Sequence, residues 1–211
     1  MATKNNNAGK LNTIVRFVGH ELQNLNYRKS NRLFNRLQPD GIMHVINFQM
    51  GQNRSILWGK FTVEIGVFIP EVYKALSEKV VPKFVTSTHC IERERLGVLG
   101  KEGKDLWWDL ADNEISIGNE ALKQLLENGE PYLFRFGSRE KLLSIWEEER
   151  LQKKLSECKV LIMAIILSCN GKKKRANELL DTEFGNHYKT AFLEYAQNVV
   201  TPLGLSFPEL K

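Results

Sequence analysis

The fold is decided by two β-type runs, Ile42-Met43-His44-Val45-Ile46-Asn47-Phe48-Gln49-Met50 and Leu57-Trp58-Gly59-Lys60-Phe61-Thr62-Val63-Glu64-Ile65-Gly66-Val67-Phe68-Ile69. Both are rich in β-branched and aromatic residues, and the polar residues 51–55 between them are typical of the turn of a β-hairpin. Side chains alternate along a strand, so every second side chain from Phe61 to Ile69 shares one face, and all of these are apolar. That face is predicted to belong to the core.

Residues upstream of this hairpin are predicted to complete the first half of an antiparallel sheet. Apolar residues recur at helical spacing over residues 11–25, which predicts an amphipathic helix that packs on the sheet. Residues 31–37 are predicted to form a strand, and Gln38-Pro39-Asp40-Gly41 predicts the tight turn after it, because Pro and Gly supply fixed and positive φ values. Three antiparallel strands are therefore expected in succession.

Two further strands and two helices are expected before residue 138. Pro70 ends the long strand and begins a short helix over residues 71–76. Residues 89–99 are predicted to form a strand with charged side chains on both faces, which favours the edge of the sheet. A short strand is expected over residues 105–110 and a helix over residues 115–126.

From Ser138 onward the composition changes to helical segments rich in Leu, Glu and Lys, and Ser138 is expected to cap the first helix. A helix over residues 160–169, a glycine turn and a helix over residues 175–180 resemble one tetratricopeptide-like hairpin. A last helix is expected over residues 188–200. One such hairpin cannot bury its own apolar face, so it is expected to dock on the sheet domain, on neighbouring helices or on a second subunit. A homo-oligomer is therefore one of the expected arrangements.

These elements predict an α+β protein with an antiparallel β-meander of about five strands, packed helices and a C-terminal α-helical segment. The predicted division is a flexible tail over residues 1–10, an α+β domain over residues 11–137 and a helical C-terminal extension over residues 138–211.

Composition places the chain among ordinary globular proteins, with 42% hydrophobic and 26% charged residues. The formal net charge of +5 allows a nucleic acid or an acidic protein as partner without requiring either. The longest apolar run, residues 160–167, is far shorter than the ~20 residues that a membrane-spanning helix needs, so no membrane association is expected. Cys90, Cys158 and Cys169 form no CxxC pair, which favours reduced, buried thiols in a cytoplasmic protein.

No catalytic or metal-binding motif stands out in the sequence. The four histidines, at positions 20, 44, 89 and 187, lie in different predicted elements, and none has a second ligand-type residue at metal spacing. The glycine-containing residues 97–104 lack the spacing of a nucleotide-binding P-loop and are interpreted as a turn. Catalytic residues, a metal and a cofactor are therefore not predicted.

One end of the sheet, which is polar and aromatic, is the best candidate for a binding surface. Trp107 and Trp108 are neighbours on a predicted strand and must point to opposite faces, so one is expected in the core and the other at a surface or groove. An exposed indole beside arginines could stack single-stranded bases or anchor a protein partner, and the sequence leaves both open. The candidate binding residues are Asn47, Gln49, Glu64, Arg93, Arg95, Trp107 and Trp108.

Several stretches within residues 11–136 carry a resemblance: Arg36, residues 44–49, residues 61–70, residues 91–97 and Trp107-Trp108. Together they resemble a bacterial family known as a domain of unknown function, number 4304. The family's first helix usually ends in a Gly-aromatic pair, where this chain has Asn26-Tyr27. The resemblance implies a helix followed by an antiparallel meander with flanking helices, and it implies no activity. The same order of elements is similar to small bacterial secretion chaperones.

The leading functional hypothesis is a non-enzymatic protein-interaction module, immunity-like or chaperone-like, whose partner is another bacterial protein. The second is a nucleic-acid-binding protein that uses Arg93, Arg95, Lys104 and residues 172–175 with a tryptophan as stacking platform. The third is an enzyme with a non-standard polar site, which requires that the polar candidates converge in space.

Overall fold

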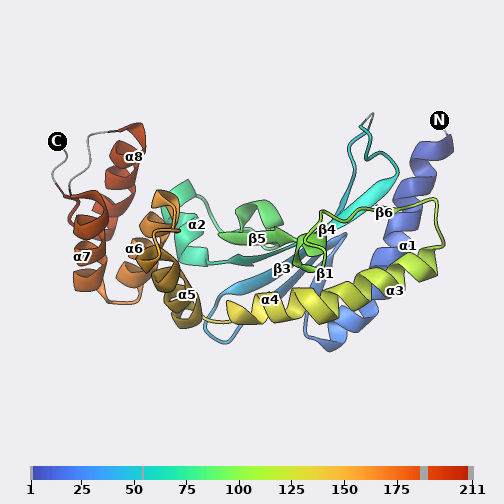
Figure 1. Cartoon of the computed structure of the whole chain (residues 1–211), viewed down its shortest axis with the longest axis horizontal. Helices are drawn as coiled ribbons and strands as arrows, with labels where there is room; N and C mark the ends of the chain where they lie inside the picture. The colour runs from blue at the N-terminus through green and yellow to red at the C-terminus, as the bar shows by residue number, and fades with distance from the viewer. Residues whose placement is uncertain (1, 54, 186–189, 209–211) are drawn as a thin grey trace. The chain divides into compact units, whose positions relative to one another are not determined.

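The computed structural model describes residues 2–53, 55–185 and 190–208, with the side chains of residues 2–6 left aside. It confirms a mixed α+β fold with an antiparallel sheet and a C-terminal helical part (Figure 1). The chain forms two compact units. The first unit comprises residues 1–69 and 82–137, and the second comprises residues 70–81 and 138–211.

The sheet of the first unit is a meander in which neighbours in sequence are neighbours in space. Every pair of adjacent strands is antiparallel, and β6 pairs with β4 beyond the end of β5. The strands are β1 (Arg28–Ser30), β2 (Leu33–Leu37), β3 (Met43–Met50), β4 (Lys60–Phe68), β5 (Glu92–Arg95) and β6 (Trp108–Asp109). The predicted turn between β2 and β3 is confirmed, with Gly41 at a φ of +88°.

Three of these strands differ from the sequence prediction. β1 was not expected, because its three residues carry no apolar alternation. The predicted strand over residues 89–99 is reduced to β5, since 3₁₀ turns η1 (Ser87–His89) and η2 (Leu96–Leu99) lie on either side of it. The predicted strand over residues 105–110 is likewise reduced to β6.

Helices cover one face of the sheet in the first unit (Figure 1). They are α1 (Ala2–Asn24), α3 (Glu114–Gln124), the π-helical segment η3 (Leu125–Gly129) and α4 (Glu130–Arg135). Beneath them Phe34, Ile46, Phe48, Phe61 and Ile65 are almost completely buried. Each such side chain contributes roughly 1.5–3 kcal/mol through loss of apolar contact with water, so this face is the core that the alternation predicts.

Helix α1 begins earlier than predicted, and residues 2–10, predicted as a flexible tail, lie within it. Two contacts hold this first part against the sheet unit. Lys10 Nζ donates to the Leu110 carbonyl at 2.8 Å, and Arg32 Nη2 donates to the Ala8 carbonyl at 3.3 Å. These partners are distant in sequence, so the spacing of apolar residues could not indicate them. That spacing alone predicted a helix that begins at residue 11.

Helix α1 is followed closely by Asn26-Tyr27, the position where the resemblance implies a Gly-aromatic pair. Asn26 has a φ of +65°, and the amides of Asn26 and Tyr27 donate to the carbonyls of Gln23 and Leu22. This is a Schellman cap, whose left-handed position usually holds glycine and sometimes asparagine. Asn26 therefore occupies the left-handed position of this cap.

The second unit consists of helices α2 (Pro70–Ser77), α5 (Arg139–Leu151), α6 (Glu157–Cys169), α7 (Lys173–Phe184) and α8 (Ala191–Val200), with the 3₁₀ turn η4 (Thr201–Leu203). Helix α6 is its centre, because residues 160–168 are all buried. Helix α7 folds back on α6 through Gly171, at a φ of +75°. The predicted N-cap Ser138 accepts the amide of Lys141, and the predicted start of the last helix, Tyr188, lies outside the described residues.

Helix α2 packs with these helices although it interrupts the sheet unit in sequence. Arg139 Nη2 donates to Glu71 Oε2 at 2.8 Å, which ties the start of α5 to the start of α2. The cysteines are free, but Cys158 and Cys169 are exposed rather than buried as predicted, because they lie at the two ends of α6. Among the described residues, no helix is sufficiently long and apolar to span a membrane.

Candidate binding site on the open face of the sheet

The face of the sheet away from α1, α3 and α4 carries a line of polar side chains. In the strand register Asn47 of β3 lies opposite Glu64 of β4, and Glu64 lies opposite Arg95 of β5. Paired residues in adjacent strands point to the same side, so these three side chains share one face. Gln49 and Thr62, the next pair on β3 and β4, point the same way.

A largely irregular segment, residues 82–91, which includes the 3₁₀ turn η1, crosses this face, and we call it the strap. Asn35 of β2 holds it with two bonds: its amide donates to the Val85 carbonyl at 2.9 Å, and its oxygen accepts the Val85 amide at 2.8 Å. Further along, Cys90 packs against Gly66, where an added Cβ would lie 2.7 Å from the Cβ of Cys90. Glycine at position 66 is thus required for the strap to lie this close to the sheet.

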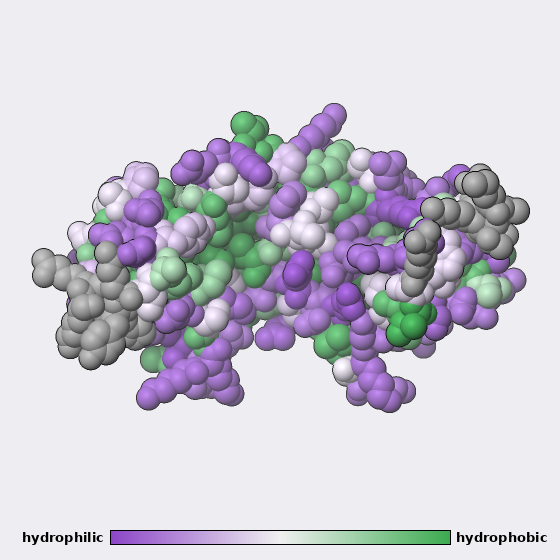
Figure 2. All heavy atoms as spheres, turned by 90° about the horizontal axis from the view of Figure 1, so that it is seen from above, coloured by the Kyte–Doolittle hydropathy of each residue, from purple (hydrophilic) through white to green (hydrophobic). Residues whose placement is uncertain are grey.

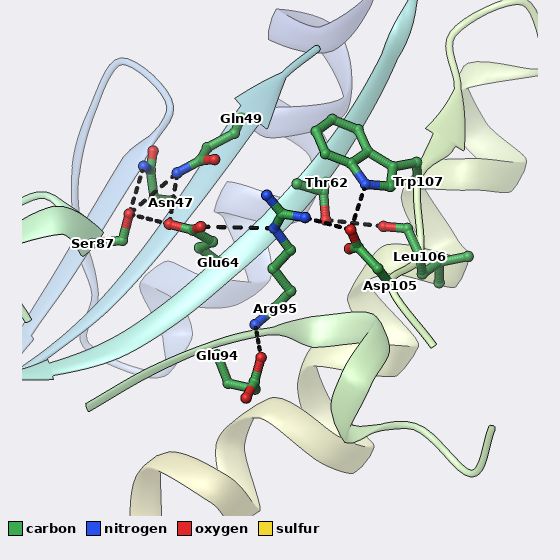
Figure 3. Close-up of polar contacts among 10 residues, drawn as sticks. All are labelled: Asn47, Gln49, Thr62, Glu64, Ser87, Glu94, Arg95, Asp105, Leu106 and Trp107. Atoms are coloured by element: carbon green, nitrogen blue, oxygen red, sulfur yellow. Dashed lines mark hydrogen bonds and ion pairs between the residues drawn. The ribbon is translucent and has the colours of Figure 1, made fainter. Parts of the chain in front are cut away.

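Glu64 is the centre of the hydrogen-bond network between strap and sheet (Figure 3). Its Oε2 accepts the Ser87 hydroxyl at 2.6 Å and the Gln49 side-chain amide at 2.7 Å. The Asn47 amide in turn donates to the Ser87 hydroxyl at 3.1 Å. A half-buried carboxylate needs such donors, since burial without them is costly.

Arg95 extends this network toward solvent. Its Nε lies 3.8 Å from Glu64 Oε1, and its Nη1 donates to Asp105, which also accepts the Trp107 indole N–H at 3.0 Å. The guanidinium carbon lies 5.3 Å from the centre of the Trp107 ring, within the range of a cation–π contact. Asp105 therefore holds the guanidinium and the indole side by side (Figure 3).

Two open pockets flank Arg95. The larger, of about 490 Å³, we call the Arg95–Trp107 groove, and it is lined by Gln49, Met50, Gly51, Gln52, Ser55, Leu57, Arg95 and Trp107. The smaller, of about 310 Å³, is lined by Glu64, Arg93, Glu94, Arg95, Val98 and Asp105. The Arg95 side chain, 38% exposed, stands between them and can contact a ligand in either.

The structure brings together five of the residues that sequence analysis singled out: Asn47, Gln49, Glu64, Arg95 and Trp107. Arg93 points to the same face and lines the smaller pocket. Trp108, predicted as a binding residue, is instead 4% exposed and stacks on Phe61 in the core, with ring centres 5.2 Å apart. The alternation of strand side chains puts Trp108 there and leaves Trp107 beside the groove.

Sequence analysis missed Ser87 and Asp105, which lie outside regular strands. One signal could have indicated them. Three polar side chains, Asn47, Gln49 and Glu64, share one sheet face, and buried polar groups require partners. Those partners had to come from a segment without periodicity, which the sequence pattern cannot place.

The Ser87 and Cys90 side chains in and beside this network hold the strap in place and are not presented as reactive groups. Ser87 is completely buried and donates its hydroxyl to Glu64, so it is not presented to a molecule in the groove. Burial raises the pKa of the Cys90 thiol well above its usual value, which keeps it in the unreactive thiol form. No group of three His, Cys, Asp or Glu side chains in the part of the chain that the structure describes could hold a metal ion.

A second polar network lies on the helix-covered face. Glu130 of α4 accepts the Tyr27 hydroxyl at 2.6 Å and Arg36 Nη2 at 2.7 Å, and the Arg36 guanidinium stacks on the Tyr27 ring at 4.4 Å. Arg36 Nη2 and Gln38 Nε2 both approach His44 Nδ1, at 3.1 and 3.2 Å. Both are donors, so Nδ1 of His44 is an acceptor and the ring is neutral.

The surroundings of this network shift two pKa values. Burial first, then the charge of Arg36, lowers the pKa of His44 to about 4, against a smaller opposing effect of the Phe136 backbone. Burial and the adjacent Glu130 carboxylate raise the pKa of Tyr27 well above its usual value. The hydrogen bonds of Glu130, Arg36 and His44 therefore join α4 to β2 and β3.

Comparison with known proteins gives a family but no characterised relative. A family model described as "Domain of unknown function (DUF4304)" matches residues 18–137, more than half of the chain. That range contains both polar networks and the Arg95–Trp107 groove. Comparisons with curated proteins and with solved structures found no match. The chain therefore belongs to the family described as domain of unknown function DUF4304.

Proposed function

We propose that the chain is a non-enzymatic protein-interaction module and that the Arg95–Trp107 groove is the centre of its interface. The observation that carries this proposal is the guanidinium held over the indole at 5.3 Å, at the edge of an open groove. Trp and Arg are the residues most enriched among interface hot spots, particularly where neighbouring groups hold them in place before binding.

The lining of the groove supports a polypeptide as its occupant. Met50 and Leu57 offer apolar contacts, whereas Gln49 and Gln52 offer both hydrogen-bond donors and acceptors. A mixed lining of this kind resembles a protein interface, in which a small apolar centre is surrounded by polar groups. Over the face of the molecule seen in Figure 2, hydrophilic side chains are interspersed among hydrophobic ones.

The charges around Arg95 favour a protein over a nucleic acid at this site. Its guanidinium is balanced by Asp105 and Glu64, and Glu94 also lines the adjacent pocket. Nucleic-acid binding depends on protein cations that neutralise phosphates. Carboxylates beside those cations repel the phosphates. The partner that we propose is another protein of a bacterial cytoplasm, bound as an immunity-like or chaperone-like module binds its target.

Affinity purification of the tagged chain from its native cells, with and without nuclease, tests this proposal. We expect one protein in stoichiometric amount that survives nuclease. We expect Trp107→Ala to lower its recovery at least ~10-fold, which is the size of effect that loss of a hot-spot residue produces. Phe134→Ala is the control, because it removes an exposed aromatic ring outside the groove from the same unit.

Equal recovery with Trp107→Ala and Phe134→Ala would refute the groove as the interface. Partners that disappear after nuclease would favour the nucleic-acid hypothesis instead. Thermal unfolding of both variants should match the wild type, so that any loss of recovery reports binding and not misfolding.

A further inference from the structure

An open pocket lies between α1 and the β1–β2 hairpin, at the edge of the sheet opposite to β5. Its volume is about 780 Å³. The residues that line it are Asn12, Val15, Arg16, Gln23, Lys29, Asn31 and Arg32. Three of them are cations, three are amides and none is acidic, so the pocket is a concentration of positive charge and hydrogen-bond donors.

None of the three cations has a carboxylate partner among the residues that the structure describes. Arg32 is held by neutral groups: its Nε donates to Asn12 Oδ1 at 2.9 Å and its Nη2 to the Ala8 carbonyl at 3.3 Å. This fixes the plane of the guanidinium while leaving its positive charge without a counter-charge. A guanidinium oriented in advance loses little entropy when it binds an anion.

Lys29 is also held in position. Its aliphatic stem lies against α1, where an added Cβ on Gly19 would be 3.6 Å from Lys29 Cδ, and its Nζ lies 5.8 Å from the centre of the Phe34 ring. Burial, and then the charge of Arg16, lowers the pKa of Lys29 from its usual value. The two cations therefore repel one another across the pocket, and an anion between them would relieve that repulsion.

We propose that this pocket is a binding site for the phosphoryl group of a small phosphorylated molecule, held by Arg16, Lys29 and Arg32. Guanidinium and ammonium groups with neighbouring amide donors are the usual ligands of phosphate oxygens. The volume lies within the ~300–1,000 Å³ of small-molecule sites, so the pocket has room for more than a free phosphate ion. Its lining contains no aromatic ring on which a nucleic-acid base could stack.

This site shares no lining residue with the Arg95–Trp107 groove of the proposed protein interface. Loss of phosphate binding on mutation of the pocket should leave recovery of the protein partner unchanged. The failure of either proposal can therefore be distinguished from failure of the other.

Titration calorimetry with inorganic phosphate, and separately with glycerol 3-phosphate, tests the site on the full chain at low ionic strength. We expect saturable binding with one site per chain. Arg16→Gln combined with Lys29→Gln should weaken it at least ~10-fold, because two charge-assisted contacts are lost. Lys101→Gln combined with Lys123→Gln is the matched control, since it removes the same net charge from exposed positions outside the pocket.

The two ligands distinguish the source of the phosphoryl group. Tighter binding of the ester supports a phosphorylated metabolite, and equal binding supports a site for the free anion. In either case, an NMR titration of the Lys29 ammonium should show its pKa rising on binding. Arg16→Gln alone serves as a second variant, because Arg16 lies exposed on α1 and its loss should not affect folding.

Two results would overturn the proposal. One is the absence of saturable binding by both ligands. The other is an equal loss of binding in the pocket variant and in the control, which would indicate attraction by net charge only. An oligothymidylate that binds saturably and is not displaced by either ligand would also contradict it, and would assign these cations to nucleic acid.

Discussion

Each face of the central sheet carries an arginine–carboxylate pair, and the two pairs differ in exposure. On the covered face Arg36 pairs with Glu130, and the two side chains are 18% and 19% exposed. On the open face Arg95 pairs with Asp105, and these side chains are 38% and 40% exposed. Burial strengthens electrostatic interactions and raises the cost of leaving a charge unpaired. The covered pair is therefore expected to stabilise the fold, and the open pair to be available for binding.

The largest effect is expected from Glu130→Ala, which removes the partner of Arg36 and of the Tyr27 hydroxyl. We expect the free energy of unfolding to fall by about 3 kcal/mol, since a largely buried charge loses its counter-charge. Urea unfolding followed by circular dichroism measures this. Glu127→Ala, an exposed carboxylate of η3, is the control and should change stability by less than about 0.5 kcal/mol. Equal values for the two variants would remove the distinction between the faces.

The next effect is a loss of stability in acid that depends on His44. The folded protein keeps this ring neutral down to a pKa of about 4. The unfolded chain takes up the proton near pH ~6.5, so stability falls as the pH drops from that value toward 4. We expect about 2 kcal/mol of this loss between pH 7 and 4.5.

His44→Gln separates this contribution from that of the carboxylates, because a glutamine oxygen can still accept from Arg36 but does not titrate. The pH dependence of the wild type should therefore be steeper than that of the variant over this range. Parallel curves would mean that folding leaves the pKa of His44 unchanged, and would contradict this prediction.

A smaller effect is expected on the open face from Ser87→Ala. This change removes the hydroxyl that donates to Glu64 and accepts from Asn47. We expect a loss of about 1.5 kcal/mol, because one of the two lost bonds is made to a charged carboxylate. Amide hydrogen exchange in the strap should become faster, whereas that of α3 should be unchanged. Ser116→Ala, an exposed serine of α3, is the control.

The smallest effect on stability is expected from Trp107→Ala. Its indole lies beside an open groove and donates to Asp105, which is already paired with Arg95. We expect a change within about 0.5 kcal/mol, typical of surface positions. A loss above about 2 kcal/mol in the free energy of unfolding, measured by thermal or urea unfolding, would show that Trp107 stabilises the fold as a core residue does. That result would count against its proposed role in binding.

The sequence predicted those parts of the fold that local pattern determines. The alternation of residues 61–69 identified the core face, and Ser138 was correctly identified as a helix cap. The polar networks depend instead on contacts between distant segments: Tyr27 and Glu130 are 103 positions apart, and Asn47 and Ser87 are 40 positions apart. Such pairs have no local signal. The hairpin of β3 and β4 and an edge strand that carries Arg95 could be inferred, so Asn47, Glu64 and Arg95 were predicted as candidates, whereas Ser87 and Asp105 were not.

The same limit applies to the phosphoryl site that we propose. Arg16 lies on α1, while Lys29 and Arg32 lie on and beside β1, a strand too short and too polar to be predicted. Only the fold of that strand against α1 places the three cations around one pocket.

The most direct test of the difference between the two faces is hydrogen–deuterium exchange of the chain, free and bound to its purified protein partner. We predict slower exchange on binding in residues 49–53, 55–57, 93–95 and 105–107, which lie at the Arg95–Trp107 groove and the pocket beside it. Residues of α3 and α4, over the covered face, should exchange at the same rate in both states. Protection confined to other parts of the chain, with the groove unchanged, would contradict the assignment of binding to the open face.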